Sequence, residues 1–423
     1  MTDGKTSRKF DYTWVIVALC FLMIFVCLGF CSSNKSLFLA PITEALQIHR
    51  SLFSLSDSIR YISTAIVNIF FGALTAKFGN KKMIGAGFIA LIICMLCYSF
   101  AENVFGFYVG SMFLGMGLAW TTTTMVGSVI NKWCRAHKGT IMGAALAANG
   151  IGGALATQIV SPIIYRDTFG YRSAYRLVVV ILAVTFIVVM LLFRENPPED
   201  SALRKASGKE KKRGSTWSGI GFDEARRMPF FYMLAVCVFM AGLVIQSVST
   251  VAAAHMRDVG LDPAYVTTVV SVHALALAGF KFLAGFMYDH MGLRFTASVC
   301  CSAAVVCMLL LASLSNTDTG RTAAMVYGVL SSLALPLETI MLPLFAGDLF
   351  GQKAYNKILG IVVSVNTAGY AVGAPLINGG FDLLGSYRPM FFLCAGLMVG
   401  VLILLQFTLN AAYREKKRIL AQE

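Results

Sequence analysis

The sequence predicts an all-α membrane protein in which twelve transmembrane helices form two pseudo-symmetric bundles of six. Three observations support this prediction. Only 13% of the 423 residues are charged and 57% are hydrophobic, whereas an ordinary soluble domain has about 25% charged residues. Apolar stretches of nearly bilayer-crossing length recur along the chain, and short motifs of the first half return in the second.

Each apolar stretch is close to the roughly 20 residues that a helix needs to cross a bilayer. The first half contains six of them, at 14–38, 53–75, 83–101, 105–130, 139–164 and 173–193. The second half contains six more, at 229–254, 264–288, 295–315, 322–348, 357–379 and 389–411. The first stretch is too long and too aromatic for a cleavable signal peptide, so we expect it to remain as a transmembrane helix.

A polar and strongly basic stretch separates the two sets of spans. We therefore expect an N-terminal bundle at 1–193, a basic cytosolic linker at 194–228 and a C-terminal bundle at 229–423 that ends in a short cytosolic tail. The cations of the linker would lie near anionic lipid headgroups. The 38 glycines fit the close helix packing that such bundles need.

Lys and Arg are distributed unequally between the segments that join the spans. With the N-terminus inside, 25 of the 35 fall in cytosolic segments, seven in outer segments and three within spans. Cytosolic segments of membrane proteins carry such an excess of cations. The distribution predicts a multi-pass protein of the plasma (inner) membrane with both termini cytosolic. It also explains the net charge of +14 without nucleic acid as a partner.

The sequence lacks the familiar motifs for hydrolytic, redox or metal chemistry. It contains no His-Glu-x-x-His, no Gly-x-Ser-x-Gly and no complete nucleotide-binding loop. Ten of the eleven cysteines lie in apolar stretches, where packing is a better explanation than disulfides or metal binding. We therefore expect no enzymatic activity, no metal and no cofactor, so that gradients would drive any transport.

Motifs of the first half return in the second at nearly constant separation. Residues 72–82 at the end of the second span match residues 285–294 at the end of the eighth, 213 residues later. Gly143, Asn149 and Gly152 of the fifth span return as Gly360, Asn366 and Gly369 of the eleventh, each 217 residues later. Internal repeats of this kind are typical of transporters built from two related halves.

The repeated loops resemble the signature Gly-x-x-x-Asp-Arg-x-Gly-Arg-Arg of the major facilitator superfamily. The second copy keeps the carboxylate as Asp289, whereas the first has Ala76 in its place. The resemblance implies the major facilitator fold, with loops that latch the inner face of the bundles. We expect the latch of the first half to be weaker or differently built. The residues that we assign to these gating loops are Gly72, Lys77, Gly79, Lys81, Lys82, Gly285, Asp289, Gly292 and Arg294.

Further segments resemble the monocarboxylate transporters of that superfamily. Residues 133–152 combine an aromatic residue, a basic cluster and then small residues, as in the fifth helix of that family, and 29–35 place a lysine after a Gly-Phe pair, as in its first. Lys281 matches the arginine of an eighth-helix segment. The chain also resembles the oxalate–formate exchangers, but it has Asn366 where these have a lysine. Leu277 stands where proton-coupled members have an aspartate.

Three ionisable residues lie deep in apolar spans: Lys35, Lys281 and Glu338. A lysine at the centre of a membrane helix costs about 2.5–3.5 kcal/mol even on a mild scale, so such residues usually face a cavity or a partner. An anionic substrate would neutralise a lysine there and accept charge-assisted hydrogen bonds. The alternatives are that Lys35 extends outward to the interface, and that Lys281 and Glu338 form a purely structural ion pair.

The complete prediction for the site includes neutral groups as well. The residues assigned to substrate binding are Lys35, Lys281, Asn34, Asn149, Asn366 and Tyr370, and those assigned to proton coupling are Glu338 and His273. His273 could equally be a packed histidine, and the two repeated asparagines could bond between helices. Aromatic residues that could line a cavity or simply pack are Phe30, Tyr61, Trp120 and Tyr370. Arg60 and Asp57 are interpreted as a hydrated interfacial pair.

These features predict a secondary transporter of small organic anions, with monocarboxylates as the first choice and alternating access as the mechanism. The predicted partners are a small organic anion, with or without a coupled proton, and the lipid bilayer, and we expect a monomer. A carboxylate exchanger of the oxalate–formate type and an efflux carrier of amphipathic compounds remain alternatives. The sequence leaves the carboxylate, the direction of transport and the coupling ion open.

Overall fold

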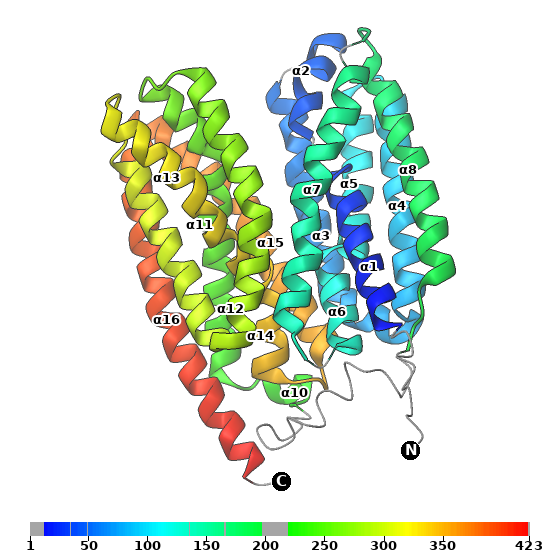
Figure 1. Ribbon diagram of the computed structural model, residues 1–423, viewed down its shortest axis with the longest axis vertical. Coiled ribbons are helices and arrows are strands. Elements are labelled where there is room, and N and C mark those ends of the chain that lie inside the picture. The colour runs from blue at the N-terminus through cyan, green and yellow to red at the C-terminus, as the bar shows by residue number, and fades with distance from the viewer. Residues whose placement is uncertain are drawn as a thin grey trace, which may run out of the picture.

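The computed structural model describes residues 12–33, 35–48, 50–134, 136–164, 166–196 and 219–421, and these are almost entirely helical. Two groups of long helices stand side by side, one formed by α1 to α8 and the other by α11 to α16 (Figure 1). Helix α1 begins and α16 ends at the same end of the molecule, which we call the terminal end. The other end is called the opposite end.

The first group contains the helices that precede the predicted linker. Their bounds are α1 (Thr13–Met23) with a π-helical turn at Ile24–Leu28, α2 (Lys35–Ala45), α3 (Arg50–Phe78), α4 (Asn80–Phe100), α5 (Val104–Thr121), α6 (Thr123–Trp133), α7 (Lys138–Ile164) and α8 (Gly170–Leu192). Thr122 leaves helical geometry, so that α5 and α6 share one predicted span.

The second group contains the helices that follow it. Their bounds are α10 (Phe222–Ala225), α11 (Pro229–Asp258), α12 (Pro263–Ala312), α13 (Asp318–Ala334) with a 3-10 turn at Leu335–Glu338, α14 (Met341–Phe350), α15 (Tyr355–Leu384) and α16 (Arg388–Leu420). Helix α12 contains two predicted spans, because Gly292 interrupts it with a φ of 82°. Gly79, with a φ of 79°, separates α3 from α4 in the same way.

Twelve spans result, as predicted. In the described part of the chain, ten helices are long and apolar enough to cross a membrane, with α12 counted once and a shorter apolar helix at Thr13–Leu28 not included. The prediction of one uninterrupted first span at 14–38 is wrong, because that helix ends at Leu28 and α2 begins only at Lys35. At this point Gly29 packs against the backbone of Gly152 on α7.

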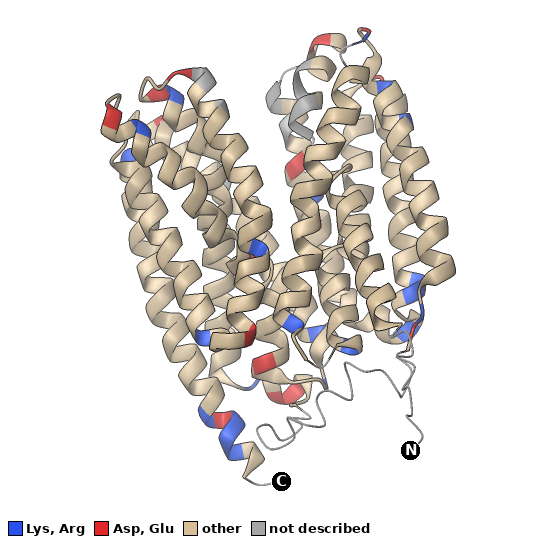
Figure 2. Cartoon of the chain, in the orientation of Figure 1, with Lys and Arg blue, Asp and Glu red and all other residues tan. Residues whose placement is uncertain are grey.

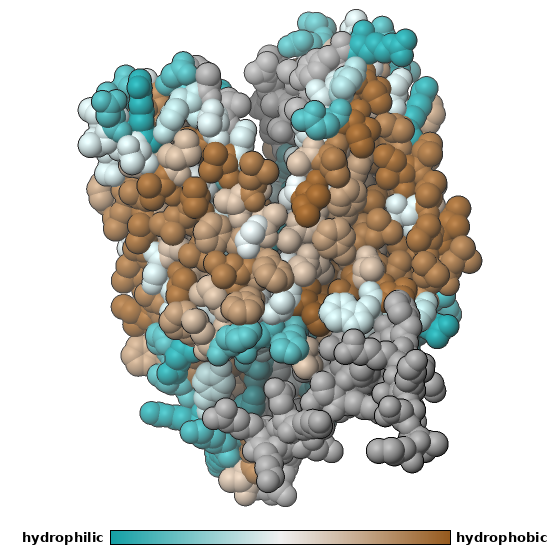
Figure 3. Space-filling model, in the orientation of Figure 1, coloured by the Kyte–Doolittle hydropathy of each residue, from teal (hydrophilic) through white to brown (hydrophobic). Residues whose placement is uncertain are grey.

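An apolar belt surrounds the molecule. Charged residues gather at the two ends of the helices and are sparse between them (Figure 2). The space-filling view shows a brown apolar band between two hydrophilic rims (Figure 3). Large hydrophobic side chains such as Val184, Leu191 and Phe392 are exposed on this outer surface. Exposed apolar surface on this scale needs lipid around it, so the chain is an integral multi-pass membrane protein.

The two groups meet through glycines along α3 with α15 and along α7 with α12. A Cβ on Gly143 would lie 2.5 Å from the carbonyl oxygen of Lys281, and one on Gly360 would lie 2.3 Å from that of Asn68. Only glycine therefore permits this close approach. At the opposite end the two groups separate, and a groove opens between them (Figure 3).

Candidate functional site

A cavity of about 230 Å³ lies between the two helix groups. Its wall takes residues from α3, α5, α6 and α7 of the first group and from α12, the 3-10 turn and α15 of the second. A site shared in this way changes shape whenever the groups move relative to each other. The ionisable residues in its wall are Arg60, Tyr61, Lys281, Glu338 and Tyr370.

Lys281 is a buried cation in this wall. It lies on α12 where that helix packs against Gly143 of α7. Its ammonium group interacts with Glu338 through space, but among the described residues it has no direct ion-pair or hydrogen-bond partner. A buried ammonium without such a partner favours a ligand that supplies negative charge.

Glu338 is the buried carboxylate of the same wall. It ends the 3-10 turn that interrupts the tenth span beside Pro336. The hydroxyl of Tyr370 lies close to the carboxylate, and Oε2 is buried without a hydrogen-bond partner among the described residues. The structure thus places Lys281, Glu338 and Tyr370 in the wall of one cavity.

Arg60 is a second cation of the cavity, which the sequence interpretation missed. It does approach Asp57, at 3.8 Å, but its side chain is only 11% exposed while that of Asp57 is 42% exposed. The guanidinium donates to Oγ of Ser32 at 2.6 Å and lies 4.3 Å from the ring centroid of Tyr61. A hydrated interfacial pair is therefore the wrong description of Arg60. Helix α3 begins at Arg50, about three turns before Arg60.

Asparagines supply neutral polar groups in the wall. Oδ1 of Asn149 accepts a hydrogen bond from Ser33 at 2.8 Å, and Asn366 donates to the carbonyl of Val238 at 2.9 Å. Both asparagines line the cavity and also bond to neighbouring helices. Asn68, which the sequence did not single out, is 0% exposed, and within the described part of the chain neither its Nδ2 nor its Oδ1 has a hydrogen-bond partner.

The structure does not bring every predicted residue to the cavity. His273 lies in a separate small pocket between α11, α12 and α13, where its Nδ1 is 2.8 Å from Oγ of Ser331. Among the described residues that line the central cavity, Tyr61 is present but Phe30 and Trp120 are not. Lys35 is the first residue of α2, and nothing further is described for its side chain. Asn34 lies outside the described residues.

The predicted gating loops lie at the terminal end. Asp289 accepts hydrogen bonds from the backbone nitrogens of Gly139 at 3.0 Å and Thr140 at 2.7 Å, and from the hydroxyl of Thr140 at 2.6 Å. Its carboxylate therefore faces the N-terminus of α7, where helix-end N–H groups favour negative charge. Close by, Gly285 packs backbone to backbone against Gly139. Arg294, after the break at Gly292, donates to Asn410 of α16.

The first group has a different latch, since Ala76 offers no carboxylate. Glu195, just after α8, accepts from the backbone nitrogens of Asn80 at 3.0 Å and Lys81 at 2.8 Å, and it pairs with Lys132 at 3.3 Å. Burial of Glu195 opposes its ionisation, but these hydrogen bonds and Lys132 together hold the pKa of its carboxyl below the usual range. Of the remaining loop residues, Gly79 lies beside the Glu195 carboxylate, whereas Gly72 packs against Lys357 of α15. Lys77 lies in the last turn of α3 and Lys82 in the first turn of α4.

A membrane protein whose two helix groups enclose a charged cavity of about 230 Å³ and close on one side of it is built as a transporter. The particular family follows from its sequence: residues 19–337 and 234–423 match the model described as Major Facilitator Superfamily. The chain belongs to the Major Facilitator Superfamily, which confirms the predicted fold.

Individual relatives agree with this assignment. The chain is 22% identical over 435 residues to monocarboxylate transporter 2 of Homo sapiens, with 96% of this chain and 87% of that protein covered. It is 24% identical over 407 residues to the multidrug resistance protein MdtG of Enterobacter lignolyticus, with 92% and 89% covered. The crystal structure of FucP in the outward conformation superposes with a TM-score of 0.72 at 14% identity, covering 94% of this chain and 99% of that one.

Proposed function

We propose that this Major Facilitator Superfamily transporter carries small organic monoanions, with monocarboxylates as the preferred class, by alternating access. The observation that carries the proposal is the buried ammonium of Lys281, which faces the central cavity without a direct partner among the described residues. A carboxylate would accept charge-assisted hydrogen bonds from it. The similarity to monocarboxylate transporter 2 supports the same class.

The charges around the cavity also favour coupling to a proton. Arg60 is offset by Asp57 at 3.8 Å, and Lys281 is offset by Glu338 through space, so the empty site is close to neutral. A bound monoanion adds one negative charge, and a proton on the free Oε2 of Glu338 removes it again. Since moving net charge through a low-dielectric passage is costly, the neutral complex is the one that reorients.

The proposal includes an orientation and a division of the chain. The terminal end, with both termini and the linker at 194–228, faces the cytosol of the plasma (inner) membrane, as the excess of Lys and Arg favours. The groove at the opposite end then opens to the outside, which makes this an outward-open state. Residues 1–193 and 229–423 are the two units that rock about the cavity, and the carrier works as a monomer.

Replacing Lys281 tests the proposal directly. Uptake of labelled lactate, pyruvate, acetate and oxalate into proteoliposomes would be compared for the wild type, Lys281→Gln and Lys353→Gln. Lys353 is exposed at the terminal end and supplies the matched control. Loss of a charge-assisted hydrogen bond predicts at least about tenfold weaker monocarboxylate affinity for Lys281→Gln alone. Unchanged affinity in that variant would place the substrate site elsewhere.

An efflux carrier of amphipathic compounds is the second candidate, because the chain is similar to MdtG. Arg60 and Lys281 in the cavity wall oppose it for hydrophobic cations, which they would repel. The same proteoliposomes distinguish the two functions. A cationic dye that competes with lactate at low concentration would favour efflux, whereas preloaded oxalate that drives lactate entry would favour an exchanger.

A further inference from the structure

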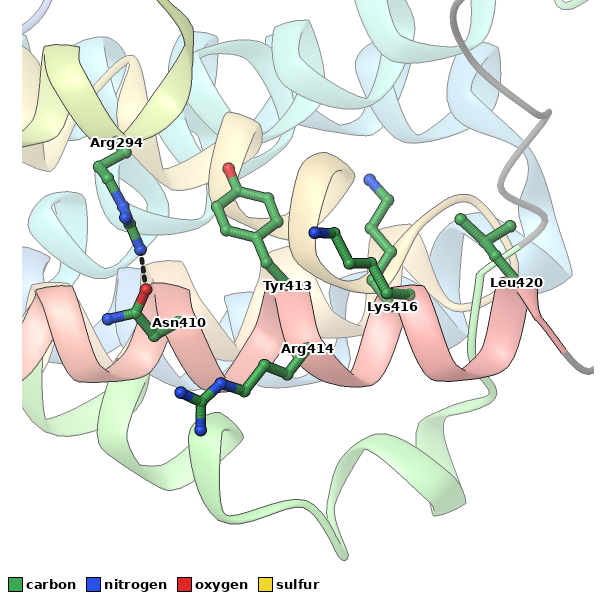
Figure 4. A pocket seen from close by; sticks show the side chains of 7 residues that line it. Arg294, Asn410, Tyr413, Arg414, Lys416 and Leu420 are labelled. Atoms are coloured by element: carbon green, nitrogen blue, oxygen red, sulfur yellow. Dashed lines mark hydrogen bonds between the residues drawn. The ribbon is translucent and has the colours of Figure 1, made fainter.

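A second pocket, of about 660 Å³, lies at the terminal end between α12 and α16 (Figure 4). It is separate from the central cavity, and none of its lining residues belongs to that site. The polar residues that line it are Arg294, Asn410, Tyr413, Arg414, Lys416 and Lys417. Figure 4 shows Arg294 meeting Asn410, with Tyr413 and Lys416 rising from the helix beside them and Arg414 extending from its other edge.

The pocket is strongly positive. Four of its lining residues are cations and none is acidic. Arg294 is held by its hydrogen bond to Asn410, and Nζ of Lys416 donates to the carbonyl of Asp348 at 3.1 Å. Arg414 and Lys417 form no ion pair within the part of the chain that the structure describes. A cluster of this kind attracts an anion with several acceptor oxygens, such as a phosphate ester.

Apolar surface adjoins this cationic pocket on the membrane side. Phe407 is 61% exposed and Ile403 is 53% exposed, both on α16, and Phe295 next to Arg294 is also exposed. Phe407 lies three residues before Asn410 and seven before Arg414, a spacing that places all three on one face of the helix. The surface therefore offers cations at the rim of the apolar belt and an apolar strip beneath them.

We propose that this pocket binds the headgroup of an anionic phospholipid of the phosphatidylglycerol type, whose acyl chains lie along Phe407 and Ile403. A free phosphate ester would use only the cations, whereas a lipid uses both halves of the surface. Basic pockets between transmembrane helices are suited to such headgroups. The bound lipid would join the part of α12 that follows Gly292 to the last helix. This lipid proposal does not depend on the substrate proposal.

The test is native mass spectrometry of the full chain in detergent with added phosphatidylglycerol or phosphatidylcholine. The double variant Arg414→Gln with Lys417→Gln removes two pocket cations and leaves Arg294 in place. The matched control, Arg226→Gln with Arg418→Gln, removes the same charge from exposed positions outside the pocket. From the value of a cation near a lipid surface, we expect phosphatidylglycerol affinity to fall on the order of 30-fold in the pocket variant only.

Each other outcome overturns the proposal. Equal loss of binding in both double variants would show attraction to general surface charge rather than a site. A wild type that binds phosphatidylcholine as well as phosphatidylglycerol would remove the role of the headgroup. Competition by soluble glycerol 3-phosphate at the concentration of the lipid would identify a site for free phosphate esters. Thermal unfolding of each variant verifies that the protein compared is folded.

Discussion

At the scale of single residues, the central cavity stands out because buried polar atoms in its wall have no hydrogen-bond partner in the part of the chain that the structure describes. These atoms are Nδ2 and Oδ1 of Asn68, Nε of Arg60 and Oε2 of Glu338. All three residues line the cavity. Buried polar groups in proteins are almost always paired, and an unpaired one costs about 1–3 kcal/mol. A substrate that brings both acceptors and donors would relieve these costs.

The first prediction concerns Asn68, whose amide can both donate to and accept from a substrate hydroxyl. Asn68→Leu keeps the number and branching of the side-chain heavy atoms and removes both functions. We expect the half-saturation concentration for lactate to rise about 5- to 30-fold, the equivalent of about 1–2 kcal/mol, while that for propionate, which lacks the hydroxyl, stays constant. Uptake of the two acids in the same proteoliposomes measures the difference. Equal changes for both acids would contradict a role in recognising hydroxyl groups.

The sequence could identify only some of these residues. Depth within an apolar span was sufficient for Lys281 and Glu338, because charges there are costly. A second span that begins at residue 53 places Arg60 near the interface. In the structure α3 begins already at Arg50, and Arg60 lies in the cavity wall. Asn68 gave no signal, since a lone asparagine is inexpensive in a span and its lack of partners exists only in the folded structure.

At the scale of helices, hydropathy predicted the spans but not their interruptions. The first span is interrupted after Leu28 and another at Thr122. In a third span, a 3-10 turn at Leu335–Glu338 replaces the α-helix. Thr122 and Glu338 lie in the cavity wall, and so does Leu28. An average over 20 residues does not detect a break of four, although Pro336 is a local sign of the last one. The interruptions thus coincide with the site, as in transporters whose discontinuous helices form the binding region.

The two latches differ in a way that the loop motif predicted only in part. Asp289 connects the two helix groups by facing the N-terminus of α7. Ala76 occupies the matching position in the first group and has no carboxylate. There Glu195, which lies outside the repeated motif, contacts α4 through Lys81 and α6 through Lys132. That the first latch is differently built stays a prediction, and the Glu195 contact is the group that we expect to form it. The residue that builds it could not be predicted, because the contact is distant in sequence.

Glu195 gives a prediction about pH. Because the pKa of its carboxyl is lowered in the folded protein, its ionised form stabilises the fold above the usual carboxyl range, and this contribution is lost as the pH falls through the lowered pKa. We expect Glu195→Gln to lower the unfolding temperature in detergent at about pH 7, and the difference from wild type to shrink as the pH falls below the usual carboxyl range. The half-exposed contact makes the effect modest.

The control for this measurement is Asp223→Asn, at an exposed site near the same end of the molecule. Its difference from wild type should stay small at every pH. A deficit in Glu195→Gln that persists unchanged at acid pH would show that the glutamate contributes through packing rather than through its charge.

At the scale of the whole molecule, the two helix groups touch on the terminal side of the cavity and part on the other. The glycine contacts of Gly143 with α12 and of Gly360 with α3 bring the backbones together, while the groove opens at the opposite end (Figure 3). In alternating access the groups would separate at the terminal end and come into contact at the opposite end. The position of the repeats in the sequence predicted two halves, but which side is closed depends on packing between them.

The proposed orientation can be tested by labelling. Asp223→Cys places a thiol at the terminal end, and Asp318→Cys places one at the opposite end, both at exposed sites. In a background without the eleven native cysteines, a membrane-impermeant maleimide added to intact cells should label position 318 and leave position 223 unlabelled until the cells are opened. Labelling of position 223 in intact cells would reverse the orientation.

The central claim is that one cavity takes the anion on Lys281 and the proton on Glu338. The measurement that tests it most directly is lactate transport by Glu338→Gln in proteoliposomes, recorded both as net uptake driven by an inward proton gradient and as exchange between labelled and unlabelled lactate at equal pH. The account predicts that gradient-driven accumulation is lost while exchange persists, because the glutamine mimics the protonated glutamate, so that the site is neutral only with the anion bound. Full gradient-driven accumulation by Glu338→Gln would contradict it.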